Sequence, residues 1–136
     1  MASIALSTST KTVRSEALNT AIDDGGAATL YFYTDPQPAT ADEAIGASTQ
    51  LAAVPCPTAP FGTVTDGVLT SHEISNHLTT EGTGSATWAR LINGAGTTIG
   101  DFTVGGIGSG ANIEMQSTQF YPGVIVAISS FVVTEV

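Results

Sequence analysis

The segment closest to a metal-binding motif runs from His72 through Glu73 to His77. The zinc motif H-E-x-x-H puts its histidines four positions apart on one face of a helix, whereas these two are five positions apart. In a strand, positions 72 and 77 have opposite parity, so their side chains point to opposite faces. We therefore expect exposed or hydrogen-bonded surface histidines rather than metal ligands or catalytic groups.

The glycine-rich segment GGIGSG (105–110) resembles a phosphate-binding loop in composition only. It lacks the lysine of G-x-x-x-x-G-K-[ST], its spacing differs from G-x-G-x-x-G, and no strand-to-helix unit flanks it. Ser109 does not lie in a G-x-S-x-G nucleophile elbow, because position 107 is Ile. We expect this segment to be a mobile connection between two strands.

Paired carboxylates occur at Asp23-Asp24 and at Asp42-Glu43. The first pair ends a predicted helix, where negative charge is slightly unfavourable, and must be solvated. The second lies in a proline-flanked loop and could ligate a cation, although the calcium pattern D-x-[DN]-x-[DN]-G is absent. Because these spacings assemble no nucleophile, base and orienting group, we expect a protein that is not an enzyme, with no catalytic residue, metal or cofactor.

Other residues suggest contact surfaces. Phe120 and Tyr121 precede a Pro-Gly turn, where aromatic side chains either fill the core or, if exposed, act as contact anchors. Trp88 shares a strand face with Arg90; it is either half-buried with the arginine stacked nearby or part of a subunit contact. Near the N-terminus, two apolar residues alternate with small polar ones. The candidate subunit contacts are Ile4, Leu6, Trp88, Arg90, Phe120 and Tyr121.

The charge composition excludes two classes of partner. The chain has 136 residues, with 3 Lys+Arg and 12 Asp+Glu, and a formal net charge of −9. The three cations are Lys11, Arg14 and Arg90, too few to neutralise several phosphates of a nucleic acid or to bind an anionic membrane surface. We therefore expect neither nucleic acid nor membrane as a partner.

Cysteine and targeting signals are sparse. Cys56 is the only cysteine, so neither an intrachain disulfide nor a cysteine-based metal cluster can form. The N-terminal sequence MASIALSTSTK has no basic region typical of a secretory signal. The longest apolar run, 124–128, is far shorter than the roughly 20 residues of a membrane span. We expect a soluble protein made in the cytoplasm.

One helix is predicted, over residues 11–24, with Thr10 or Ser9 as its N-cap and Gly25-Gly26 at its end. Its apolar residues recur along one face, which should pack on a sheet. They are Val13, Ala17, Leu18, Ala21 and Ile22. Residues 1–10 are predicted to form a flexible arm or an edge strand.

The rest of the chain predicts strands. Ala28–Thr34 alternates with Leu30 and Phe32 on one face and Tyr31 and Tyr33 on the other. Turns are predicted at Asp66-Gly67 and Asn93-Gly94, and one helical turn at 40–44. Further strands are expected at Gln50–Val54, Phe61–Val64, Val68–Ile74, Ser85–Ile92, Thr97–Val104, Ala111–Met115 and Gly123–Val133.

These elements indicate the fold class. Thr and Ser account for 33 of the 136 residues, 42% of residues are hydrophobic, and only 11% are charged, which favours an all-β domain over a helical bundle. Short strands at steady spacing are typical of an antiparallel sandwich or barrel. We predict a mainly β protein, an antiparallel β-sandwich or jelly-roll-like domain over residues 11–136 with one N-terminal helix.

Several segments occur in the order seen in one family. They are Y-T-D-P-Q-P-A-T-A-D (33–42), L-A-A (51–53), A-P-F-G (59–62), D-G-V (66–68), G-S-A-T-W-A-R-L (84–91), the glycine turn at 105 and the strand 123–130. Over about residues 14–136 the chain resembles small virion structural proteins of tailed bacteriophages, of the capsid decoration or cement type. The P-x-P-A-T-A-D loop and the A-T-W-x-R-L strand are the most specific parts.

The resemblance implies a β-sandwich or jelly-roll-like subunit that binds the outside of a phage head and stiffens it. The implied partners are the phage major capsid protein and further copies of the chain in a homo-oligomer. The implied location is the outer capsid surface of the virion, after synthesis in the bacterial host cytoplasm. Sparse charges leave neutral faces suited to burial between subunits, and the segment 3–9 could add a strand to a neighbour. A phage tail or fibre component, including a receptor- or glycan-binding module, is the alternative.

Overall fold

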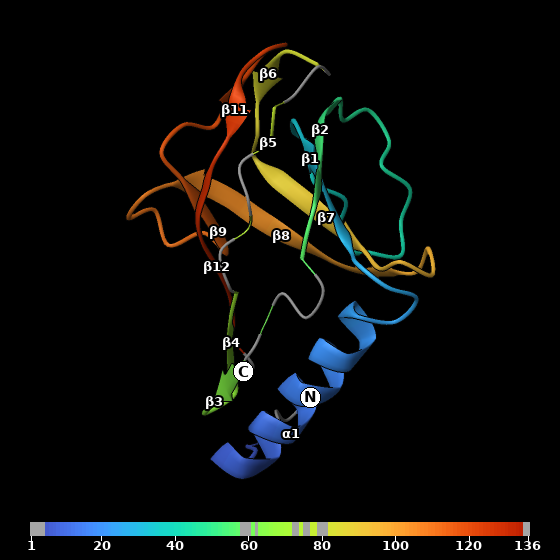
Figure 1. Cartoon of the computed structure of the whole chain (residues 1–136), viewed down its shortest axis with the longest axis vertical. Coiled ribbons are helices and arrows are strands. Elements are labelled where there is room, and N and C mark those ends of the chain that lie inside the picture. The colour runs from blue at the N-terminus through green and yellow to red at the C-terminus, as the bar shows by residue number, and fades with distance from the viewer. Residues whose placement is uncertain are drawn as a thin grey trace.

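The fold is given by a computed structural model, which describes residues 5–57, 61, 63–71, 74, 77–78 and 82–134. Within these residues one helix precedes twelve strands (Figure 1). The helix is α1 (Thr8–Ile22). The strands are β1 (Thr29–Tyr33), β2 (Gln50–Pro55), β3 (Thr63–Thr65), β4 (Val68–Thr70), β5 (His77–Leu78), β6 (Gly84–Ser85), β7 (Trp88–Ile92), β8 (Thr98–Gly106), β9 (Ile113–Met115), β10 (Gln119–Phe120), β11 (Ile125–Val126) and β12 (Ile128–Thr134).

Eight strands form one sheet in the order β2-β1-β7-β8-β9-β12-β4-β3. Its neighbours are antiparallel except for β8 and β9, which run parallel. Two short pairs, β10 with β6 and β11 with β5, lie outside this sheet. The prediction of a mainly β fold with one N-terminal helix is therefore confirmed. The sheet is mixed, however, and the described strands show no closed sandwich or jelly roll.

The parallel neighbours β8 and β9 are joined by only residues 107–112, although a parallel connection usually needs a dozen residues or more. The chain turns back within this short loop because Gly108 and Gly110 have φ angles of 84° and 82°, which side chains with a Cβ rarely adopt. The carboxylate of Glu114 accepts hydrogen bonds from both glycine N–H groups, at 3.1 and 3.0 Å. The predicted strand connection is thus a tight, braced loop.

The core forms on one face of the curved sheet. Leu30 and Phe32 of β1 are both fully buried there, as their alternation predicts. The rings of Phe61 and Phe102 each meet Phe131 edge-on at centroid distances of 5.0 Å. Such contacts between aromatic rings add to the stabilisation from apolar burial. These side chains of β1, β8 and β12 belong to one cluster of buried apolar residues.

The helix begins earlier than predicted. Ser7 is its N-cap, and its Oγ accepts a hydrogen bond from the N–H of Thr10 at 3.3 Å. Residues 8–10 are therefore helical rather than part of an arm. Leu6 is half-buried, and Ile4 lies outside the described residues.

The buried face of α1 also differs from the prediction. Ile22 is buried and Leu18 packs against the core, as predicted, but Val13, Ala17 and Ala21 are exposed. Ser15, which is not part of the predicted apolar face, is buried. The reason is that polar side chains dock the helix onto the turn between β3 and β4. Thr12 accepts a hydrogen bond from the N–H of Gly67 at 3.2 Å, and Ser15 donates to the carbonyl of Gly67 at 3.1 Å. Asn19 donates to the carbonyl of Phe61, just before β3, at 2.6 Å.

The two predicted turns are confirmed. Asp66 and Gly67, with φ angles of 52° and 78°, connect β3 to β4. Asn93 begins the turn from β7 to β8, and its side-chain oxygen accepts from the N–H groups of Ala95 and Thr97 at 3.1 and 2.9 Å. Its amide also donates to the carbonyl of Ala21 at 3.0 Å. This turn therefore caps the C-terminal end of α1 as well.

Two predicted strands are each divided. In the segment 123–133, β11 pairs with β5, and the chain then leaves at Ala127 to enter the large sheet as β12. In the segment 85–92, β6 pairs with β10 before β7 joins β1 and β8. Each break marks a change of pairing partner. The predicted helical turn at 40–44 is a single turn, closed by a 3.2 Å bond from the Glu43 N–H to the Thr40 carbonyl.

Candidate functional site

The face of the sheet opposite the core carries a second group of large side chains. In the register of β1 and β7, Tyr33 lies opposite Trp88 and Tyr31 opposite Arg90. These four residues alternate with the core residues of the same strands, so they occupy the other face. Residues 34–49, which connect β1 to β2, lie against this face. We call this connection the clasped loop.

Arg90 joins the clasped loop to two strands. Its Nε and Nη2 donate to the two carboxylate oxygens of Asp101 on β8 at 2.7 and 2.9 Å, and its Nη1 donates to the carbonyl of Glu43 at 2.8 Å. Both side chains of the ion pair are almost fully buried. The hydrogen bond to Asp101 raises the pKa of Arg90 above its usual value, so the guanidinium stays charged. A buried charge pair therefore holds the loop down.

Trp88 provides a second attachment. Its indole Nε1 donates to the carbonyl of Thr34 at 2.8 Å, and its ring stacks on Tyr33 at a centroid distance of 4.6 Å. The guanidinium carbon of Arg90 lies 5.6 Å from the centre of the indole ring, which fits a cation–π contact. The predicted stacking of the arginine near Trp88 is confirmed, but the indole is fully buried rather than half-buried.

The base of the clasped loop is closed by further hydrogen bonds. Thr87 Oγ1 donates to the Asp35 carboxylate at 3.0 Å. The N–H of Thr34 donates to the carbonyl of Thr49 at 3.1 Å, and the hydroxyl oxygen of Thr34 accepts from the N–H of Thr49 at 3.0 Å. The outer side of the loop remains exposed, including Gln37 and Ala39. An exposed loop fixed by a buried anchor loses little conformational freedom when it binds, which suits a contact surface.

The six candidate contact residues separate into different environments. The structure brings Trp88 and Arg90 together, but buries both beneath the clasped loop. Phe120 is buried against Phe32 at a centroid distance of 5.4 Å, so it is a core residue. Tyr121, the next residue, is 55% exposed and retains the surface that a contact anchor needs. Leu6 is half-buried, and Ile4 lies outside the described residues.

Two further exposed apolar side chains were not singled out from the sequence. Ile107 is 62% exposed in the β8–β9 loop, and Ile125 is 60% exposed on β11. Together with Tyr121 they lie in the segment 102–134, in which Glu114 is the only Asp, Glu, Lys or Arg. We call the described surface of this segment the neutral side. The sequence signal that could have identified the neutral side is the distribution of charged residues along the chain, rather than the net charge of the whole chain.

The groups considered for metal chemistry do not assemble in the part of the chain that the structure describes. No three His, Cys, Asp or Glu side chains there are placed to hold a metal ion. His72, Glu73 and the side chain of His77 lie outside that part. Cys56 is buried, and this burial raises the pKa of its thiol to about 11, so at neutral pH it is a protonated core group.

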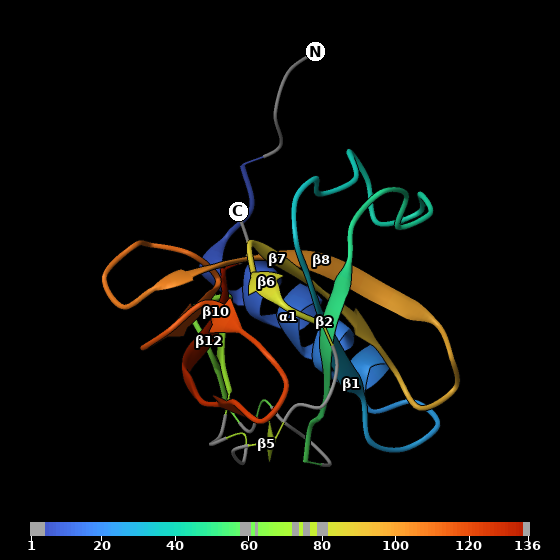
Figure 2. The same ribbon diagram turned by 90° about the horizontal axis from the view of Figure 1, so that it is seen from above.

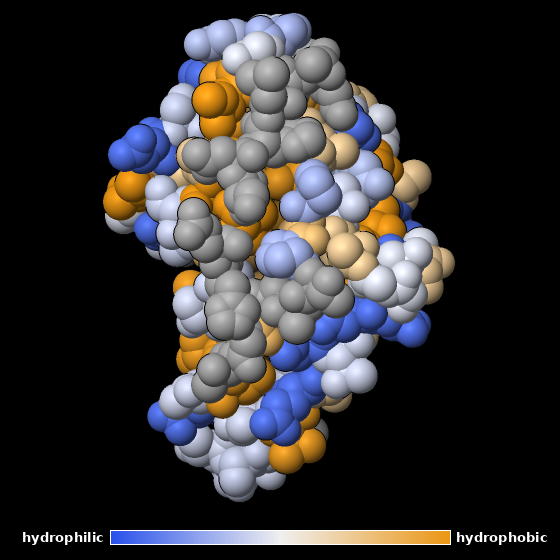
Figure 3. All heavy atoms as spheres, in the orientation of Figure 1, coloured by the Kyte–Doolittle hydropathy of each residue, from blue (hydrophilic) through white to orange (hydrophobic). Residues whose placement is uncertain are grey.

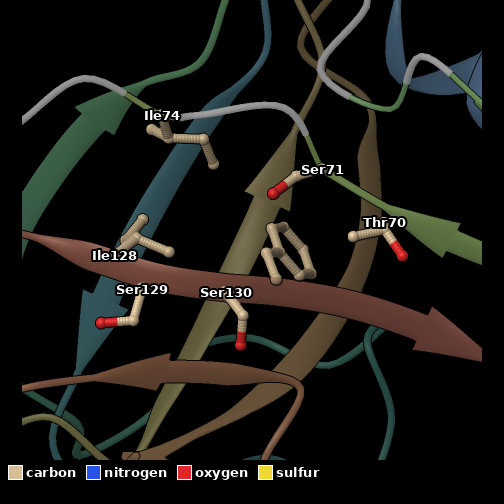
Figure 4. Close-up of a pocket in the computed structure, with 7 residues that line it drawn as sticks. Thr70, Ser71, Ile74, Ile128, Ser129 and Ser130 are labelled. Atoms are coloured by element: carbon tan, nitrogen blue, oxygen red, sulfur yellow. The ribbon is translucent and has the colours of Figure 1, made fainter.

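A recess of about 260 Å³ lies between β4 and β12. It is lined by Thr70, Ser71, Ile74, Ile128, Ser129, Ser130 and Phe131. In Figure 4 the side chains of Ile74 and Ile128 point toward one another across the opening, with the Ser71 hydroxyl nearby. Hydroxyl groups around an apolar floor can bind a small ligand that has both polar and apolar faces.

Comparison with protein-family models, curated proteins and solved structures found no match for this chain. Among the described elements, no helix has both the length and the apolar character needed to cross a membrane.

Proposed function

We propose that this chain is a non-enzymatic virion structural protein that decorates and stabilises a bacteriophage capsid as a cement protein. The observation that carries the proposal is the attachment of the clasped loop to β7. The two most specific segments of the resemblance are the P-x-P-A-T-A-D loop and the A-T-W-x-R-L strand. Trp88 and Arg90 of the strand donate to the carbonyls of Thr34 and Glu43, which flank the loop motif on either side. Two segments that are about 50 positions apart in the sequence are therefore bonded to one another in the fold. A family that shares both segments would be expected to share this contact.

The exposed outer side of the clasped loop is the surface that we propose for contact with the major capsid protein. Its shape is fixed by the buried ion pair of Arg90 and Asp101, so binding costs little loop entropy. The proposed location is the outer capsid surface, after synthesis in the bacterial host cytoplasm. The subunits are proposed to form homo-oligomers, and neither nucleic acid nor membrane is a proposed partner.

The finer fold expectation, a β-sandwich or jelly-roll-like subunit, belongs to the same proposal. Its support is that one core cluster receives side chains from both ends of the sheet order. Val54 comes from β2 at one end, and Leu69 comes from β4 near the other. A flat sheet would hold these strands far apart, so the sheet must curl around the core.

Cryo-electron microscopy of virions that carry this gene product tests the proposal directly. We expect density for the chain on the capsid surface, with the clasped loop toward the capsid shell. In reconstitution with particles that lack the protein, Ala39→Arg should abolish binding, whereas Ala17→Arg, an exposed alanine on α1, should bind normally. Density confined to the tail, or equal binding by both variants, would contradict the proposal.

A tail or fibre component that binds a receptor glycan is a second candidate, which the hydroxyl-lined recess favours. Sugars present both hydroxyl groups and apolar ring faces, which match this lining. Under this alternative, Ser71→Phe should obstruct the recess and abolish host adsorption, and Ala39→Arg should leave adsorption unchanged. Normal adsorption by a folded Ser71→Phe variant would remove the support for this candidate.

A further inference from the structure

The side chain of Asn93 connects the turn between β7 and β8 to the C-terminal end of α1. Its Oδ1 accepts hydrogen bonds from the N–H groups of Ala95 and Thr97 at 3.1 and 2.9 Å, and its Nδ2 donates to the carbonyl of Ala21 at 3.0 Å. The residue is only 6% exposed. An amide can make all three bonds because it carries both an acceptor and a donor, whereas an ionised carboxylate in its place would lose the bond to α1.

The residue after Asn93 is glycine, and its backbone lies against the loop that follows α1. A Cβ at position 94 would collide with the carbonyl of Gly25, and a Cβ at position 25 would collide with the backbone of Ala95. The N–H of Ala95 also donates to the carbonyl of Asp24 at 3.2 Å. In Figures 1 and 2 the β7–β8 turn lies beside the loop after α1, at the right of both views. The end of α1 therefore packs against the backbone of Gly94.

An Asn-Gly sequence can undergo deamidation, a reaction that needs only water. The backbone nitrogen of Gly94 attacks Cγ of Asn93, the bond from Cγ to Nδ2 breaks, and ammonia leaves with the proton of the Gly94 nitrogen. Water then opens the resulting succinimide ring and leaves aspartate or isoaspartate at position 93. Glycine favours ring closure because it has no side chain to obstruct its nitrogen. The other asparagines of the chain, at positions 19, 76 and 112, do not precede glycine.

The hydrogen bonds of Asn93 oppose deamidation as long as α1 is docked. Ring closure draws Cγ onto the Gly94 nitrogen and removes Nδ2, so the side chain must give up its bond to the Ala21 carbonyl. The bonds from Ala95 and Thr97 hold Oδ1 in the turn and restrict the rotation that ring closure requires. Breaking these bonds in a buried site has a free-energy cost. The end of α1 must therefore move away before Asn93 can react.

The docking of α1 depends largely on polar contacts. Ser15 and Asn19 donate to carbonyls of Gly67 and Phe61, while the outer surface of the helix leaves Val13 63% exposed. Figure 3 shows hydrophilic residues gathered at the lower right, over α1. An element with few buried apolar side chains opens at a lower free energy than the whole fold. We therefore expect α1 to detach locally more often than the sheet unfolds.

We propose that Asn93 is a deamidation site that becomes reactive when α1 detaches, and that the product keeps α1 detached. An aspartate at position 93 can still accept from Ala95 and Thr97, but it places a carboxylate oxygen opposite the carbonyl of Ala21, where an N–H group had donated. The new negative charge also lies at the C-terminal end of a helix, where it is unfavourable. Because ammonia is lost, the change is irreversible, and the detached form accumulates as the protein ages.

Peptide mass spectrometry of the purified full chain, sampled during incubation at neutral pH, tests the dependence on α1. The double variant Ser15→Ala/Asn19→Ala removes two of the polar contacts that dock the helix, so deamidation at Asn93 should be faster by about tenfold than in the wild type. Met115→Ala is the control, because it weakens the core at β9 and lowers the stability of the whole fold. A wild-type rate in the double variant, or equal acceleration by Met115→Ala, would overturn the proposal.

Amide hydrogen exchange tests the effect of the product. Asn93→Asp should accelerate exchange in residues 16–22 by about fivefold or more, because α1 loses its bond to the turn. The matched control is Asn112→Asp, which makes the same chemical change where Nδ2 donates to the carbonyl of Val132 at 3.2 Å, and which should leave exchange in α1 unchanged.

Equal exchange of α1 in the wild type and Asn93→Asp would overturn the proposal, and so would equal acceleration by Asn112→Asp. If Asn93→Asp does not fold, the deamidated wild type, separated by anion exchange, replaces it in the same measurement. Loss of the whole fold in that species would show that position 93 supports the sheet rather than the docking of α1, and would also overturn the proposal.

Discussion

The clasped loop and the neutral side are both exposed, but they are held in place by different means. The clasped loop depends on side chains that are distant in sequence: Arg90 reaches the carbonyl of Glu43, and Trp88 reaches that of Thr34. The loop of the neutral side depends on a local brace, in which Glu114 binds the backbone of Gly108 and Gly110. Mutations in the strands should therefore release the clasped loop, whereas the neutral side should respond only to changes nearby.

The two regions also differ in the number of their charged side chains and in what those side chains bind. The clasped loop carries Asp35, Asp42 and Glu43 and has a buried arginine beneath it, whereas the neutral side has one carboxylate bound to its own backbone. A buried charge fixes a unique geometry, but its removal leaves its partner uncompensated. Variants that affect one region and spare the other provide the clearest tests of this comparison.

The largest effect is expected for Arg90→Ala. The substitution leaves the Asp101 carboxylate buried without its partner, which should lower the free energy of unfolding by about 3–5 kcal/mol. Urea denaturation monitored by circular dichroism measures this change. Arg14→Ala, which alters an exposed side chain on α1, should change stability by less than about 1 kcal/mol. Equal destabilisation by the two variants would contradict the anchoring role of Arg90.

Thiol labelling shows where Arg90→Ala acts. Cys56 follows β2, and its buried thiol, with a pKa raised to about 11, should react slowly at neutral pH. Release of the clasped loop should free the β1–β2 hairpin to open, so labelling should accelerate in Arg90→Ala under native conditions. Glu114→Ala should leave the labelling rate unchanged, because its loop lies elsewhere in the sheet. Acceleration by both variants would indicate a global rather than a regional effect.

A smaller effect is expected for Trp88→Phe. Phenylalanine keeps an aromatic ring beside Tyr33 but removes the donor to the Thr34 carbonyl, at a cost of about 1–3 kcal/mol. Amide hydrogen exchange should become faster in residues 34–49 and remain unchanged in residues 107–112. Tyr31→Phe is a control on the same sheet face. Unchanged exchange in the clasped loop would show that the indole hydrogen bond does not hold it.

Local patterns predicted much of the fold. The alternation of Leu30 and Phe32 identified the core face of β1, and Asp66-Gly67 identified a turn, because both signals depend on neighbouring residues only. The face of α1 was predicted only in part: Ile22 and Leu18 pack in the core, but the burial of Ser15 was missed because it depends on a bond to Gly67, 52 positions away. The division of the strand at Ala127 was missed because it results from a change of pairing partner, which periodicity does not report.

The candidate site shows the same limit. A two-residue turn at Asn93-Gly94 would place Arg90 opposite Thr97, but the observed turn closes between Asn93 and Thr97 and places Arg90 opposite Asp101. The ion pair therefore depends on the register of the turn, and the sequence showed only that a turn was present. Phe120 and Tyr121 are adjacent in sequence but differ completely in burial, because Phe120 ends β10 and packs on Phe32, whereas Tyr121 lies beyond the strand.

The smallest effect is expected for Glu114→Ala on the neutral side. The substitution removes the acceptor for two backbone N–H groups that can turn to solvent, so stability should fall by only about 1 kcal/mol. Hydrogen exchange should become faster at residues 107–110, while the clasped loop keeps its wild-type exchange. Glu16→Ala on α1 is the matched control, since it removes the same charge from an exposed helix position and should leave both regions unaltered. If Glu114→Ala instead accelerated exchange in the clasped loop, the two regions would be one cooperative unit, because a local brace cannot loosen a loop anchored by Arg90.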